Sequence, residues 1–289
     1  MKKTLVMALA LTLTVAFAGC GNATDNTTNT ETTPATTEST VAESTVAEST
    51  VEDTTEATDD AETTPADDAE DVKSEGVMTY AEYVAADLDT EVTVETYVQA
   101  KQSWWDNKAT VYTQDHDGGY FLYNMACSEE DYAKLEKGTK IKVTGFKSEW
   151  SGEVEIIDAT FEIEDGSYVA EPVDVTADLA SDDLINYQNQ FVSFKGMTVE
   201  AAGQDDAGND VAFLYNWDGS GTDGDDLYFT VSKDGASYSF TVESYLCDKD
   251  SDVYAAVKNL SIGDVIDLEG FLYWYEGVNP HITSVTAAN

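Results

Sequence analysis

The sequence predicts a mainly β protein in which two tandem five-stranded barrels, each with one helix, follow a disordered acidic linker. A repeat, strand-like alternation around it and a long segment without large apolar residues lead to this prediction. In the first copy of the repeat, Leu135 is followed by Gly138, Ile141, Val143, Gly145, Phe146, Gly152 and Ile157. In the second copy, Leu260 is followed at the same offsets by Gly263, Ile266, Leu268, Gly270, Phe271, Gly277 and Ile282. Ungapped self-similarity of this kind indicates two copies of one structural module.

The N-terminus has the composition of a secretion signal. Lys2 and Lys3 precede an apolar run over residues 5–17, which is too short for a usual membrane span. The run ends in Phe-Ala-Gly before Cys20, and small residues before a cysteine resemble the lipobox of bacterial lipoproteins. The resemblance implies that residues 1–19 are removed and that Cys20 is lipidated, which anchors the chain on the outer face of the cytoplasmic membrane. An ordinary signal peptide, with Cys20 as a bystander, is the alternative.

Residues 20–75 form the predicted tether. After Cys20 this stretch is rich in Thr, Glu, Asp, Ala and Ser and contains no Leu, Ile, Phe, Tyr or Trp. Such a segment cannot bury enough apolar surface to offset the entropy lost on ordering, so we expect it to be disordered. We interpret it as a spacer that carries the folded part away from the membrane through a cell wall.

The charge of the chain is strongly one-sided. The formal net charge is −43, from 57 Asp and Glu against 14 basic residues, and all of the basic residues are lysine. Because affinity for a phosphate backbone comes mainly from cationic side chains, we do not expect nucleic acid as a partner. A cluster formed by Lys137, Lys140, Lys142 and Lys147 is the one feature that favours it.

The elements of the first module, residues 76–166, follow from alternation and capping signals. Tyr80, Tyr83 and Leu88 indicate a short helix, and alternating apolar residues from Val92 to Val98 predict the first strand. Further strands are expected over 109–113 and 120–125. Ser128 followed by acidic residues predicts a helix that ends near Gly138. The last two strands are expected over 140–146 and 153–163.

The second module, residues 178–289, repeats this order with a longer central part. Leu184 and Tyr187 indicate a short helix, and strands are expected over 191–199, 211–215, 227–231 and 238–246. A helix over 252–260 and strands over 265–275 and 281–285 complete the module.

Three strands, a helix and two strands is the order of an OB-fold, a five-stranded Greek-key barrel. The stretch from Leu135 to Gly145, and its twin from Leu260 to Gly270, resembles the segment from the helix to strand four in bacterial OB-fold domains. With the lipobox, the tandem modules resemble uncharacterised surface lipoproteins of Gram-positive bacteria.

No arrangement of residues points to catalysis. The only histidines are His116 and His281, and no hydrolase triad order, zinc-protease motif, phosphate-binding loop or Cys-x-x-Cys motif is present. We therefore expect no enzyme and no cofactor. Cys127 and Cys247 occupy matching places in the two modules, and equivalent sites in tandem domains rarely come close enough for a disulfide, so we expect free, buried thiols.

An acidic, glycine-rich loop is a candidate for weak calcium binding. Its carboxylates are Asp218, Asp223, Asp225 and Asp226. Calcium prefers oxygen ligands on flexible loops, but the spacing is not that of an EF-hand. A solvated hairpin tip is the alternative.

Aromatic residues near the predicted turns are the candidate ligand-binding residues: Trp104, Trp105, Trp150, Tyr273, Trp274 and Tyr275. OB-folds bind oligonucleotides and oligosaccharides with such loops and the adjacent strand face. Adjacent Trp104 and Trp105 cannot both point inward from a regular strand, so we expect one of them to be exposed.

These observations predict a membrane-anchored, extracytoplasmic lipoprotein that acts as a non-catalytic binding or adhesion module. A glycan, a peptide or a protein, such as a cell-wall glycan or a surface protein, is the expected ligand. A nucleic-acid-binding OB-fold protein at the cell surface and a structural cell-wall spacer are the two alternatives.

Overall fold

The computed structural model describes residues 73–288, which belong to one compact unit. The predicted signal peptide, Cys20 and nearly all of the acidic tether lie outside the described residues. Within the described part, no helix is both long and apolar enough to cross a membrane.

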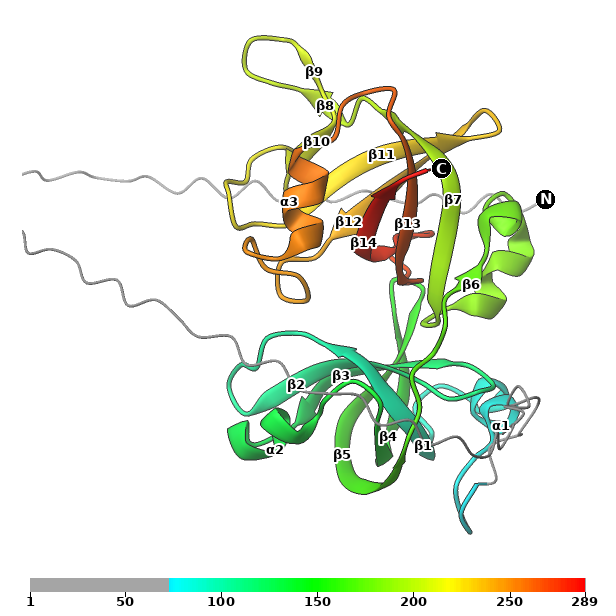
Figure 1. The fold of residues 1–289 in the computed structure, drawn as a ribbon. Helices are drawn as coiled ribbons and strands as arrows, with labels where there is room; N and C mark the ends of the chain where they lie inside the picture. The colour runs from blue at the N-terminus through cyan, green and yellow to red at the C-terminus, as the bar shows by residue number, and fades with distance from the viewer. Residues whose placement is uncertain (1–72, 289) are drawn as a thin grey trace, which may run out of the picture. The chain divides into compact units, whose positions relative to one another are not determined.

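The first barrel closes in the strand order β1-β2-β3-β5-β4 (Figure 1). Its strands are β1 (Glu91–Lys101), β2 (Lys108–Gln114), β3 (Gly119–Ala126), β4 (Thr139–Trp150) and β5 (Glu153–Ser167). Helix α1 (Tyr80–Ala85) precedes β1, and α2 (Glu129–Lys134) connects β3 to β4. All pairs are antiparallel except β3 and β5, which run parallel.

The second barrel has the same order, β7-β11-β12-β14-β13, and β13 pairs again with β7. Its strands are β7 (Phe191–Glu200), β11 (Leu227–Lys233), β12 (Ala236–Val242), β13 (Val265–Phe271) and β14 (His281–Ala287). Helix α3 (Asp252–Lys258) takes the place of α2, and β12 and β14 form the parallel pair. The predicted fold, a mainly β chain with two OB-fold-like five-stranded barrels, is confirmed.

The second barrel carries additional short elements, some before β7 and some in its longer central part, where the single strand expected over 211–215 is divided into two short strands. These are β6 (Val173–Asp174), η1 (Thr176–Asp178), η2 (Asp182–Tyr187), β8 (Gly203–Gln204), β9 (Asp210–Val211) and β10 (Phe213–Tyr215). The short helix expected around Leu184 is a 3-10 helix, and the second sheet already begins at Val173, ahead of the expected boundary at residue 178. The strand expected to reach Leu246 ends at Val242, because the Glu243 carboxylate accepts hydrogen bonds from the next backbone N–H groups and turns the chain.

The helices begin where the side chains can cap them. Ser128 accepts a hydrogen bond from the N–H of Asp131, which confirms the predicted N-cap. Ser251 does the same for α3, and Thr79 forms a capping box with Glu82 at α1. Each cap satisfies a backbone donor that would otherwise lack a partner at the start of the helix.

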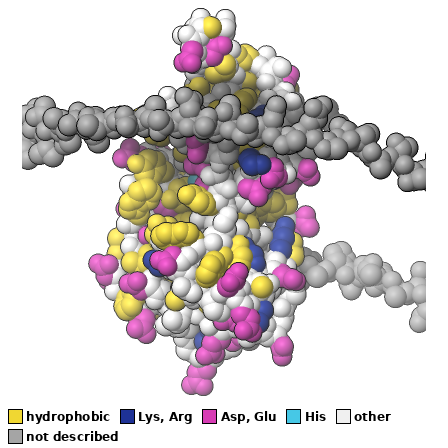
Figure 2. Space-filling view, turned by 90° about the vertical axis from the view of Figure 1, so that its left-hand side faces the viewer, with side chains coloured by type: hydrophobic (Ala, Val, Ile, Leu, Met, Phe, Trp, Pro, Cys, Tyr) yellow, Lys and Arg dark blue, Asp and Glu magenta, His cyan; other side chains and the backbone are white. Residues whose placement is uncertain are grey.

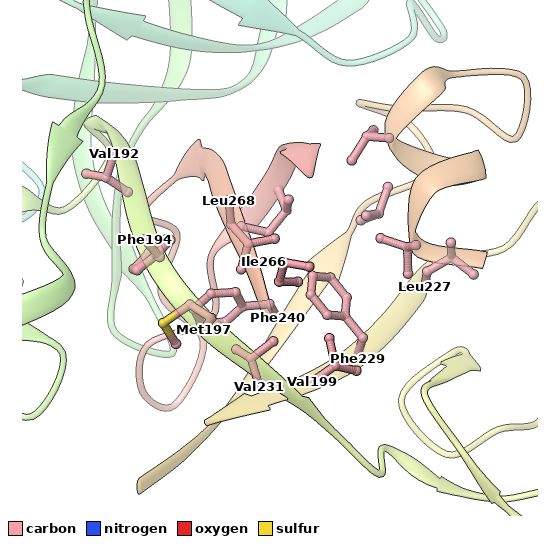
Figure 3. Packing of buried hydrophobic residues seen from close by; sticks show 14 of the residues in the cluster. Val192, Phe194, Met197, Val199, Leu227, Phe229, Val231, Phe240, Ile266 and Leu268 are labelled. Atoms are coloured by element: carbon pink, nitrogen blue, oxygen red, sulfur yellow. The ribbon is translucent and has the colours of Figure 1, made fainter. Parts of the chain in front are cut away.

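Alternate strand residues fill the interior of each barrel. Figure 3 shows the second core, in which residues of β7, β11, β12 and β13 converge. Phe194 and Phe240 pack there with ring centroids 4.7 Å apart. On each strand, the residues that alternate with these core residues point out of the barrel. These outward side chains can contact the other barrel, a ligand or solvent.

The repeat in the sequence marks positions where both barrels need glycine. Gly138 and Gly263 each end the turn before the fourth strand, with φ of +91° and +94°, a region that other residues rarely adopt. Gly145 and Gly270 lie where the last two strands of each barrel approach closely, and a Cβ at either position would collide with the neighbouring strand. The two copies therefore share a backbone requirement.

Candidate binding groove beside the second barrel

The second and third strands of the first barrel have an outward face that is covered. Tyr112 of β2 and Phe121 of β3 are opposite each other and point away from the core. Both are buried with Phe271 of β13, and the Tyr112 and Phe271 rings stack with centroids 4.5 Å apart. The surface that an OB-fold commonly offers to a ligand is, in the first barrel, occupied by the second barrel.

A buried hydrogen bond fixes this contact. The Tyr112 hydroxyl and His281 Nδ1 are 2.6 Å apart, and Tyr273 stacks on the His281 ring at 4.2 Å. Burial lowers the pKa of His281 to about 3, so the imidazole is neutral at physiological pH. The histidine acts as a structural partner of Tyr112.

Glu153, the first residue of β5, is a second buried polar group at the contact between the two barrels. Glu153 Oε2 accepts hydrogen bonds from the backbone N–H of Trp274 at 2.9 Å and from Gln188 Nε2 at 3.2 Å. Burial raises the pKa of Glu153 well above its usual range. This carboxyl group is therefore part of the contact between the barrels.

The corresponding outward face of the second barrel borders a groove, although Thr241 on this face is itself buried. Tyr228 of β11 and Thr241 of β12 are paired as Tyr112 and Phe121 are in the first barrel. They lie on the wall of a groove of about 740 Å³. The groove is lined by Gln102, Phe121, Tyr123, Trp150, Trp217, Asp226, Tyr228, Thr241, Glu243, Tyr273, Tyr275, Glu276, Asn279 and His281.

Exposed aromatic rings on two loops and one hairpin border this groove. Trp217, in the loop between β10 and β11, is 76% exposed. Trp150, at the end of β4, and Tyr275, in the loop between β13 and β14, have ring centroids 5.0 Å apart at an angle of 37°. A smaller hollow of about 240 Å³ shares Trp217, Tyr228 and Tyr275, so the groove continues along the face of β11.

The groove is acidic. Asp226, Glu243 and Glu276 line it, and none of its lining residues is a lysine. Burial and the nearby Asp226 raise the pKa of Glu243 to about 7. Figure 2 shows one face of the described residues, on which hydrophobic side chains gather among Asp and Glu side chains that outnumber Lys. A ligand in the groove meets aromatic rings and carboxylates.

The candidate aromatic residues fall into two groups. Trp150, Tyr273 and Tyr275 line the groove. Trp274 does not: it packs partly buried against the core of the second barrel, and its backbone N–H binds Glu153.

The tryptophan pair in the first barrel lies outside the groove lining. Trp104 is half-buried and donates from Nε1 to the Cys127 carbonyl at 3.0 Å, which gives it a structural role. Trp105 is 69% exposed, so one ring of the pair is free as expected, but it does not line the groove.

Several residues of the groove were not singled out from the sequence. Trp217 precedes the acidic loop, and an exposed tryptophan beside Asp218 was an available signal. Tyr228 and Tyr123 lie at outward strand positions that alternation identifies. Nothing in the sequence indicated that the open face belongs to the second barrel.

The four candidate calcium ligands have separate partners. Asp218 accepts from the N–H of Ser220, Asp225 from that of Thr222 and Asp226 from Ser244. Asp223 forms an ion pair with Lys258. Within residues 73–288, no group of three or more His, Cys, Asp or Glu side chains is arranged to hold a metal ion.

The other sequence candidates also occupy structural positions. Cys127 and Cys247 are both free, as predicted, and burial raises the pKa of their thiols to about 11 and about 12. In the lysine cluster, Lys140 pairs with Glu95 and Glu164, and Lys147 donates to three backbone carbonyls at the end of α1. These two lysines do not contribute to a free basic stripe.

No protein-family model matches the chain, and no curated protein matches it. Solved structures match its fold: the Ifi202 HINa domain in complex with dsDNA, at 12% identity and a TM-score of 0.32, covers 70% of this chain and 97% of that one. A murine DNA-binding protein bound to dsDNA matches at 9% identity and a TM-score of 0.34 over 68% and 96% of the two chains. The single-stranded DNA-binding protein from Thermus aquaticus matches at 13% identity and a TM-score of 0.22 over 69% and 94%.

One expectation is corrected by these matches. We expected no nucleic-acid partner, and this expectation used the net charge of the chain alone. It is contradicted by the matched structures, which include domains bound to double-stranded DNA. Net charge is a sum over the whole chain, including the acidic residues 20–75, and does not by itself identify what the folded part binds.

Proposed function

We propose that this protein is a non-catalytic binding protein that takes an extended ligand in the groove along β11 and β12 of the second barrel. The observation that carries the proposal is the position of the groove. It lies on the second and third strands of an OB-fold-like barrel and against its first and last loops, the surface that OB-folds use for oligomeric ligands. Its exposed rings can stack on flat apolar faces of a ligand.

A glycan or peptide chain outside the cytoplasm is the ligand class that we propose first. The lipobox-like sequence before Cys20 and the acidic tether support a lipid-anchored, extracytoplasmic protein. Replacing Cys20 by serine should release the full chain from the membrane fraction. Retention of Cys20→Ser in that fraction would contradict the anchor and leave the groove unaffected.

Single-stranded nucleic acid is the second candidate, because Trp217, Tyr228 and Tyr275 present rings on which bases can stack. Such a ligand would have to place its phosphates away from Asp226, Glu243 and Glu276. Binding that weakens steeply with salt would identify this mode.

The proposal is tested by tryptophan fluorescence of the full chain, titrated with cell-wall glycan fragments, peptides and single-stranded DNA. Trp217→Ala should weaken binding of the ligand at least tenfold. Trp105→Ala is the matched control, since Trp105 is similarly exposed but lies outside the groove lining, and it should bind as the unchanged chain does. Equal effects of both substitutions would contradict the groove as the binding site.

A further inference from the structure

Two uncharged polar side chains of the groove are bonded to each other. Thr241 Oγ1 donates to Asn279 Oδ1 at 2.8 Å. Asp226, Glu243 and Glu276 are the acidic side chains in the lining, and the carboxyl group of Glu243, with a pKa of about 7, is partly ionised at neutral pH. The ionised groups of the groove are therefore all hydrogen-bond acceptors, and a ligand with cationic donors matches them.

The carboxylates lie among aromatic rings, which changes what they can recognise. Tyr228 pairs across the strands with Thr241, which lies two residues before Glu243. Tyr275 precedes Glu276 and lies against Trp150. Aromatic ring faces attract cations, and a carboxylate beside them supplies a charge-assisted hydrogen bond. The apolar stems of lysine and arginine side chains also pack well against such rings.

We propose that the ligand of the groove is a peptide segment of a partner protein that presents lysine or arginine side chains. The charges are complementary: the groove carries three carboxylates and no lysine, and the ligand carries the cations. The continuation of the groove along β11, past Trp217 and Tyr228, gives an extended segment room for more than one side chain. This inference rests on the proposed function, since it specifies the ligand of the same groove.

A cationic peptide fits the charge of the groove better than a neutral sugar chain does. Sugar hydroxyls can donate to carboxylates, but they carry no positive charge to complement them. Ammonium and guanidinium groups only donate, which suits a wall of carboxylates.

The test uses the full chain and a labelled, end-blocked oligolysine peptide, with binding followed by fluorescence anisotropy. Oligoglutamate of the same length, glucosamine oligosaccharide and single-stranded DNA are the comparison probes. We expect saturable binding of oligolysine, at least tenfold weaker for the double variant Asp226→Asn with Glu276→Gln, and at least tenfold weaker for Trp217→Ala.

Two controls separate the groove from the general acidity of the chain. Glu130→Gln, on the exposed surface of α2, and Trp105→Ala should each change the affinity less than twofold. An equal loss in Glu130→Gln would show that net charge alone attracts the peptide and would overturn the proposal.

The comparison probes distinguish failure of this inference from failure of the proposed function. If glucosamine oligosaccharide or DNA binds with dependence on Trp217 and oligolysine does not, the cationic-peptide proposal is wrong and the groove remains a binding site. If no probe binds with dependence on Trp217, both are contradicted.

Discussion

The two barrels have the same strand order, yet they use the same surface in opposite ways. In the first, the outward pair Tyr112 and Phe121 is buried under Phe271 of the second barrel. In the second, the equivalent pair Tyr228 and Thr241 faces the groove. This face of the first barrel is thus used for the contact between the barrels. The corresponding face of the second barrel borders a groove, to which the first barrel contributes Phe121, Tyr123 and Trp150.

The repeat itself contains the residue that makes this difference. Phe146 and Phe271 occupy the same place in the two copies, but Phe146 is 41% exposed and Phe271 only 2%. Phe271 stacks on Tyr112, and Phe191 packs at its side. Identical residues at identical offsets therefore have different roles, because only one copy has a neighbouring barrel against that strand.

The largest effect on stability should come from truncating Phe271, the buried member of the pair Phe146 and Phe271. Phe271→Ala should lower the free energy of unfolding by about 3–5 kcal/mol, because it leaves a cavity between the barrels. Phe146→Ala is the matched control at the same position of the repeat, and it should lower the free energy of unfolding by no more than about 0.5 kcal/mol. Chemical denaturation of both variants measures the difference, and equal costs would show that the barrels do not pack as described.

The second-largest effect on stability is expected at the buried hydrogen bond between Tyr112 and His281. Tyr112→Phe leaves His281 Nδ1 without a partner at the centre of the contact, which should cost about 1–3 kcal/mol. Tyr228→Phe removes the hydroxyl at the equivalent position on the open face and should cost less. Thermal unfolding that ranks these two variants in the reverse order would contradict the assignment of covered and open faces.

The shared glycines should give a smaller effect that differs between the copies. Gly263→Ala should cost about 1–2 kcal/mol from its left-handed backbone alone, since open space surrounds it. Gly138→Ala should cost more, because the new Cβ would also lie 2.8 Å from Ser167 Oγ. Denaturant unfolding of the two variants checks this, and a larger cost at Gly263 would contradict the described turns.

Part of the pH dependence of stability should come from Glu153 at the contact between the barrels. The folded chain raises the pKa of Glu153, so the stabilisation tied to its protonated form is complete below a pH of about 4.5 and is lost as pH rises through the folded pKa. Glu153→Gln should flatten the fall in stability above that pH. Some slope should remain, because the pKa of Glu243 is also raised, to about 7.

The matched control for this pH prediction is Glu130→Gln on the exposed surface of α2. Its midpoints of thermal unfolding between pH 5 and pH 8 should parallel those of the unchanged chain. If Glu153→Gln showed the same slope as Glu130→Gln, the contact would not be the source of the pH dependence.

Much of the fold could be predicted from the sequence because its signals are local. Alternation at residues 92–98, the N-cap at Ser128 and the repeated glycines each reflect a requirement of a few neighbouring residues. The early start of the second sheet was not predicted, because pairing of β6 with β7 depends on a partner farther along the chain.

The candidate site was predicted only in part, for a related reason. Trp150, Tyr273 and Tyr275 were identified from their position at turns, and they do line the groove. Trp274 has the same neighbours in sequence but packs against a core, and Trp104 is held by the Cys127 carbonyl. Which aromatic side chain is free depends on contacts with residues distant in the sequence, and no local pattern records those contacts.

Hydroxyl-radical footprinting of the full chain, read by mass spectrometry, tests the central claim most directly. Trp217, Tyr275 and Tyr123 are exposed and should be oxidised readily, whereas Tyr112, Phe121 and Phe271 should be protected. A ligand of the groove should then protect Trp217 and Tyr275 and leave Trp105 unchanged. Oxidation of Tyr112 and Phe271 at the rate of the exposed set would contradict the account, because it would show that the face of the first barrel is as open as that of the second.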